Sequence, residues 1–115
     1  MKLTVKDRLN ISGLYPERSN IVNQILVKDI IKKVQIDQDE MKKIQMKNIE
    51  VNGHLQTIWN KDKAKEVNID FTEAEIGMLK NQVTELDKKN YITQDMIDLV
   101  LKIRDFNEGD KDGKK

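Results

Sequence analysis

Residues 44–59 read IQMKNIEVNGHLQTIW, and this stretch decides the fold class because its period differs from that of its surroundings. Apolar residues alternate with polar ones here, which is the spacing of a strand with one buried face. Asn52 and Gly53 both tolerate positive φ, so they predict a tight hairpin turn. We therefore expect two antiparallel strands in the middle of the chain, the second of them over residues 54–59.

The returning strand should place Leu55, Thr57 and Trp59 on one face, since alternate side chains of a strand share a side. After a polar loop, Val67 and Ile69 indicate a further short strand. The pattern leaves two forms of the sheet open, a two-stranded hairpin and a three-stranded antiparallel sheet.

Two helical segments precede this region. Thr4 is the expected N-cap of the first, over residues 4–14, and Ser19 is the expected N-cap of the second, which runs to about Val34. Apolar residues recur every three to four positions in the second segment, so one face should be buried. The apolar residues of this face are Ile21, Val22, Ile25, Leu26, Ile30, Ile31 and Val34. Asp37 then indicates the start of a short third helix.

Two more helices follow the sheet. Thr72 and Glu75 stand at capping-box spacing and predict a helix that continues to about Lys88. Asn90 suits the left-handed residue that ends such a helix. The last helix ends at Phe106, and its apolar residues cover several sides.

Together these patterns predict a mainly helical α+β fold with N-terminal helices, a small antiparallel hairpin or three-stranded sheet, and a C-terminal helix pair. The 115 residues fit one domain, which we expect over residues 1–106. Residues 107–115 combine glycines with alternating charges and predict a disordered tail.

Composition argues against several classes of function. Lys and Arg total 21 against 20 Asp and Glu, so the chain lacks the basic excess of a nucleic-acid binder, and we do not expect a nucleic-acid partner. There is no cysteine, which excludes disulfides and cysteine-based zinc sites. No apolar stretch has the length of a signal peptide or a membrane span. We expect a cytoplasmic location, in the host cell if a phage encodes the chain.

No motif for catalysis is visible. His54 is the only histidine and has no patterned carboxylate or nucleophile to work with. Asp37, Asp39 and Glu40 lack the central glycine and the spacing of a calcium loop, and helix capping explains them better. We expect no enzyme activity, no metal site and no cofactor.

Four apolar residues are candidates for contact with a partner: Trp59, Met96, Leu101 and Phe106. Trp59 is the sole tryptophan, for which packing at the edge of the core is the favoured interpretation and a partner anchor the alternative. The other three belong to the last helix, whose apolar residues lie on more than one side.

The segments 1–9 (MKLTVKDRL), 14–16 (LYP), 57–60 (TIWN), 86–89 (LDKK) and 92–93 (IT) resemble those of small phage and prophage accessory proteins. This resemblance implies a phage setting and an accessory role, and it brings no catalytic residues to carry over.

The functional hypothesis is a non-enzymatic protein that binds a host or phage protein and modulates or inhibits it. Two alternatives stay open. One is a phage structural or assembly factor that self-associates as a homo-oligomer. The other is a small-ligand binder, for example of a nucleotide, which requires a pocket with convergent Lys, Arg or Asn side chains.

Overall fold

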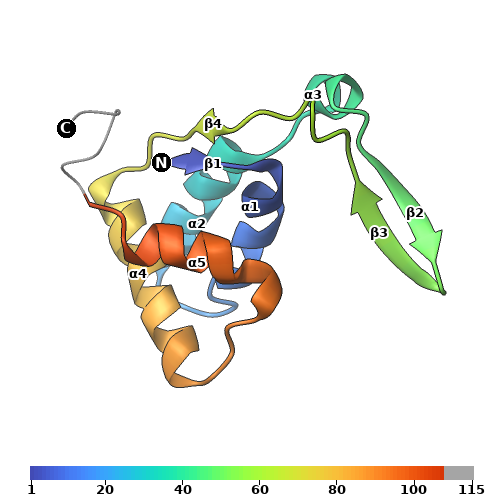
Figure 1. Cartoon of the computed structure of the whole chain (residues 1–115). Coiled ribbons are helices and arrows are strands. Elements are labelled where there is room, and N and C mark those ends of the chain that lie inside the picture. Colours follow the sequence, from blue (N-terminus) through green and yellow to red (C-terminus); the bar gives the residue numbers. More distant parts are fainter. Residues whose placement is uncertain (108–115) are drawn as a thin grey trace.

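The computed structural model describes residues 1–107, and the expected tail lies outside this range except for Asn107. The fold is mainly helical α+β, as predicted (Figure 1). In chain order the elements are β1 (Lys2–Leu3), α1 (Val5–Asn10), the 3-10 helix η1 (Ile11–Leu14), α2 (Ile21–Val34), α3 (Gln38–Lys43), β2 (Lys47–Val51), β3 (His54–Ile58), β4 (Val67–Asn68), α4 (Glu73–Lys88), the 3-10 helix η2 (Gln94–Met96) and α5 (Ile97–Arg104).

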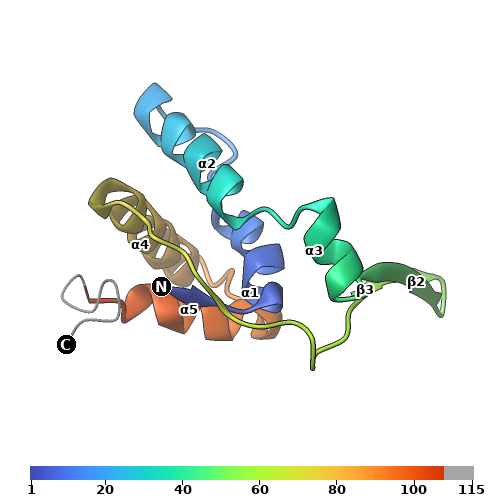
Figure 2. The same cartoon turned by 90° about the horizontal axis from the view of Figure 1, so that it is seen from above.

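The core lies within a body of four helices, in which α4 packs against α2 and α5, and α1 packs against α5. Leu3, Ile30, Leu79 and Ile103 have no exposed surface there. Burying one such aliphatic side chain stabilises the fold by about 1.5–3 kcal/mol. Helix α3 and the strands β2 and β3 lie to one side of this body in both views (Figures 1 and 2).

The predicted buried face of α2 is only partly correct. Val27, Ile30 and Val34 are buried, whereas Ile21 and Ile25 are 79% and 53% exposed. Val22 and Ile31 are exposed as well. The reason is that the first turn of α2 extends beyond α1, so the helix contacts the core only from Leu26 onward (Figure 2). Ile31 lies further along but on the exposed side of the helix.

The observed ends of several helices agree closely with the caps predicted from the sequence. Thr4 and Thr72 form complete capping boxes with residues three positions further on. Asn90 has a φ of 63° after the last turn of α4, as predicted. The N-cap of α2 is Asn20 and not Ser19, because the side-chain oxygen of Asn20 accepts from the backbone N–H of Asn23 at 2.8 Å.

The predicted hairpin is confirmed, and the three-stranded form of the sheet is wrong. Strands β2 and β3 pair antiparallel around Asn52 and Gly53, whose φ angles are 53° and 81°. Strand β4 pairs instead with β1, through Lys2 opposite Asn68. Strand β1 has only two residues, which is too short to show a strand period, so neither β1 nor its pairing with β4 could be predicted from the sequence.

Candidate functional site

The hairpin of β2 and β3, here called the hairpin arm (residues 47–58), projects from the helical body (Figure 1). Four of the five residues in each strand are exposed. Among residues 1–107, neither outer edge of the arm pairs with another strand. A two-stranded hairpin alone is marginally stable in water, so an arm of this kind is suited to contact with something else.

Both faces of the arm carry apolar side chains. The register places Ile49 and Val51 on one face and Leu55, opposite Glu50, on the other. Leu55 is 78% exposed and Val51 is 38% exposed. Neither side chain reaches the core of the helical body, so both are open to contact with a partner.

Arg8 fastens α3, the helix that leads into the arm, to the body. Its guanidinium donates to both carboxylate oxygens of Glu40 on α3, at 2.6 and 3.0 Å. It also donates to the backbone carbonyl oxygens of Val34 and Gln35 at the end of α2, at 3.0 and 2.7 Å. Charge-assisted, two-pronged bonds of this kind are among the strongest in proteins, so one buried side chain joins α1, α2 and α3.

The base of the arm is closed by backbone hydrogen bonds. Helix α3 ends with Gln45 in the left-handed region, at φ 58°, and the N–H of Met46 donates to the carbonyl of Met41 at 2.8 Å. Beyond the arm, the N–H of Asn60 donates to the carbonyl of Ile44 at 2.7 Å. The entry and exit of the arm are thus tied together, and Ile44 beneath them is buried.

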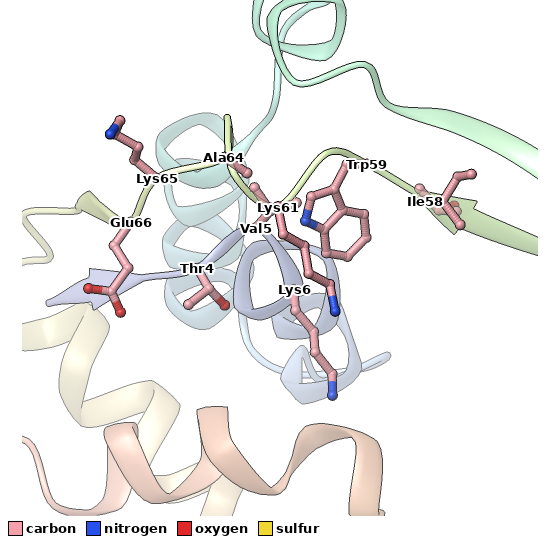
Figure 3. Close-up of a pocket in the computed structure, with 10 residues that line it drawn as sticks. Thr4, Val5, Lys6, Ile58, Trp59, Lys61, Ala64, Lys65 and Glu66 are labelled. Carbon is pink, nitrogen blue, oxygen red and sulfur yellow. The ribbon is translucent and has the colours of Figure 1, made fainter.

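A pocket of about 520 Å³ lies at this base, between the start of α1 and the loop that follows the arm (Figure 3). Trp59 is half-buried in its wall. The charged side chains of its lining are Lys6, Lys61, Lys65 and Glu66. The lining therefore combines one large aromatic ring with an excess of positive charge.

The four sequence-predicted contact residues do not form one patch. Trp59 lines the pocket just described, and Leu101, which is 37% exposed, lines a neighbouring depression that shares Thr4 and Lys6 with it. Met96 and Phe106 are partly buried and pack against the core.

The only histidine lies apart from other candidate groups. His54 is exposed at the tip of the arm, opposite Val51.

Asp37 caps α3 by accepting from the backbone N–H of Glu40 at 2.8 Å. Within residues 1–107 no three His, Cys, Asp or Glu side chains are placed to share a metal ion.

No protein-family model, curated protein or solved structure matches this chain. In the part of the chain that the structure describes, no helix has both the length and the apolar character needed to cross a membrane.

The sequence did not reveal that Lys6 and Lys61 line the same pocket as Trp59, or that Glu40 pairs with Arg8. Lys6 and Lys61 lie far apart in the chain, and so do Arg8 and Glu40, yet the fold brings each pair to one place. No local spacing rule relates such residues, because the distance between them depends on how the helices pack. A pattern of alternating lysines in the loop 61–65 was the one local sign of charge near Trp59.

Proposed function

We propose that this chain is a non-enzymatic accessory protein that binds another protein and modulates or inhibits it, with the hairpin arm as its contact element. The observation that carries the proposal is an ordered arm that exposes apolar side chains on both faces, away from the core. An arm with apolar side chains on both faces and unpaired edges can add to the sheet of a partner protein. The phage setting, with a host or phage protein as partner, is supported by the sequence resemblance.

The arm offers two kinds of contact at once. Its outer edges present backbone N–H and C=O groups that no other strand of the described residues pairs with, and a strand of the partner can extend the sheet there. Leu55 and Val51 then supply side-chain contacts above and below the extended sheet. Because Arg8 holds Glu40 and the base is closed, the arm is already ordered before binding, which lowers the entropic cost of association.

The proposal can be tested with a matched pair of variants. Leu55→Glu alters the arm, and Ile21→Glu makes the same change on α2, where the side chain is almost equally exposed, at 79% against 78%. Affinity purification from host cells followed by mass spectrometry should recover the same partner with the wild-type chain and Ile21→Glu, but not with Leu55→Glu. Equal recovery with all three chains would contradict the role of the arm.

Self-association is the rival that the arm also permits. Analytical ultracentrifugation should show the wild-type chain as a monomer over a wide concentration range. A tight homo-oligomer that Leu55→Glu dissociates would instead indicate an assembly factor, because the arm would then be covered by a second copy of the chain.

A further inference from the structure

The pocket beside Trp59 has the size and the composition of a small-ligand site. Its volume of about 520 Å³ falls within the usual range for such sites, roughly 300–1,000 Å³. Two stretches of the chain form it: the start of α1, and residues 57–66, which run from the end of the arm into the loop that leads to β4 (Figure 3). Because these stretches are distant in the sequence, the pocket exists only in the folded chain.

The aromatic wall of the pocket is available to a ligand. In Figure 3 the indole ring of Trp59 lies beside the side chains of Lys61 and Lys6. The indole N–H donates to no group within residues 1–107. Every buried polar side-chain atom in that range has a hydrogen-bond partner, so the unpaired indole N–H is not buried and is open to solvent. A flat ring stacked on an indole typically gains about 1–3 kcal/mol.

The cationic wall is equally available. Lys6 and Lys61 extend in the same direction in the close-up, whereas Lys65 points the other way (Figure 3). Lys61 forms no ion pair in the part of the chain that the structure describes, and Lys6 has only a surface pair with Asp95 at 3.4 Å. Such a surface pair is weak, so little is lost when Lys6 turns to a ligand.

The single carboxylate of the lining does not cancel this charge. Glu66 lies 3.8 Å from the ammonium of Lys102, which lies outside the lining of this pocket. Lys102 is itself paired with Asp7 and so matches Glu66 only in part, but the three lysines of the lining outnumber this one carboxylate.

We propose that this pocket binds a phosphorylated nucleoside, with the base stacked on Trp59 and the phosphate held by Lys6 and Lys61. Because the aromatic and cationic walls share the same pocket, one ligand that carries both a flat ring and an anion can contact the two walls together. This binding goes beyond the proposed protein contact of the arm and does not depend on it. The ligand is either a free nucleotide or one unit of a single-stranded nucleic acid.

Trp59 makes the test direct, because it is the only tryptophan of the chain and its ring forms part of the pocket wall. The full chain is titrated with AMP, adenosine, ribose 5-phosphate and a short oligoadenylate at low salt. AMP should quench the emission with saturation, and adenosine should bind about tenfold more weakly or worse, since it lacks the charge. Ribose 5-phosphate should compete with AMP while quenching little.

The oligoadenylate separates the two sources of the ligand. Binding much tighter than that of AMP indicates a single strand, and equal binding per site indicates a free nucleotide. Absence of saturable quenching by both AMP and the oligoadenylate would overturn the proposal.

Two double variants test whether AMP binds at this pocket or is attracted to any pair of exposed lysines. The double variant Lys6→Gln, Lys61→Gln should weaken AMP binding about tenfold or more. The matched control is Lys28→Gln, Lys32→Gln, which removes two exposed lysines of α2 and should leave the affinity unchanged. Equal weakening by both double variants would show non-specific attraction and overturn the assignment. Leu55→Glu should bind AMP normally, so failure of the arm hypothesis and failure of this one are distinguishable.

Discussion

Asp7 and Lys102 join the first helix of the chain to the last one. The Lys102 ammonium lies 2.5 Å from Oδ2 of Asp7 and 3.0 Å from the backbone carbonyl oxygen of Lys2. The same carboxylate oxygen accepts from the backbone N–H of Thr4 at 3.0 Å and completes the cap of α1. One buried carboxylate therefore serves both a local cap and a long-range ion pair.

Substitutions at Asp7 should separate these two roles. Asp7→Asn keeps an acceptor for Thr4 but removes the charge, and we expect the free energy of unfolding to fall by about 1–2 kcal/mol. Asp7→Ala also removes the capping bond and should cost about 2–4 kcal/mol. Urea denaturation measures both values, and Lys6→Gln at the neighbouring exposed position is the control. Equal losses for Asn and Ala would show that the bond from the Thr4 N–H to residue 7 contributes nothing.

Removing Glu40 should loosen the arm more than the body. Glu40→Ala leaves the buried Arg8 guanidinium with only the carbonyl oxygens of α2, and we expect a loss of about 1–3 kcal/mol, moderated by the partial exposure of Glu40. Hydrogen exchange should accelerate at the amides of α3 and the arm before it does so in α4. Glu40→Gln, which can still accept one bond, should show a smaller effect. Uniform acceleration across all helices would contradict this attachment.

Two isoleucines of α2 provide a matched test of which side of the helix is buried. Ile30 is fully buried and Ile25 is 53% exposed. Ile30→Ala should lower the free energy of unfolding by about 2–5 kcal/mol because it leaves a cavity. Ile25→Ala should change it by no more than about 0.5 kcal/mol. Thermal and urea unfolding report both values, and similar losses at the two positions would contradict the observed packing.

Tyr15 should give the protein a distinctive alkaline response. Burial raises the pKa of Tyr15 to about 12, because the charged phenolate is poorly solvated beside the core. In the unfolded chain its pKa returns to about 10. The native state therefore favours the neutral phenol, and this contribution to stability is complete below pH about 10 and is lost as the pH rises towards 12.

The variant Tyr91→Phe leaves Tyr15 as the only tyrosine, so its absorbance titration should have a midpoint near pH 12. Tyr15→Phe should remove this part of the alkaline loss of stability relative to the wild-type chain. A midpoint near that of free tyrosine would contradict the burial of this side chain.

Local signals in the sequence determined the parts of this protein that need only near neighbours. The N-cap at Thr4, the capping box at Thr72, the turn at Asn52 and Gly53, and the left-handed Asn90 all appear where they were predicted. Each depends on backbone angles and on hydrogen bonds within a few residues, so the amino-acid types alone suffice to specify it. Trp59 also stood out as a candidate, since its rarity and size are visible in the sequence.

The tertiary structure alone decided the rest. Apolar spacing on α2 did not reveal that Ile21 and Ile25 face solvent, because the buried side is set by which elements dock against the helix. The pairing of Lys2 with Asn68, the Arg8–Glu40 bond and the pocket joining Lys6 to Trp59 bring together distant parts of the chain. Such contacts form only when the whole body packs, since the entropy of closing long loops is offset by the common core and not by any local preference.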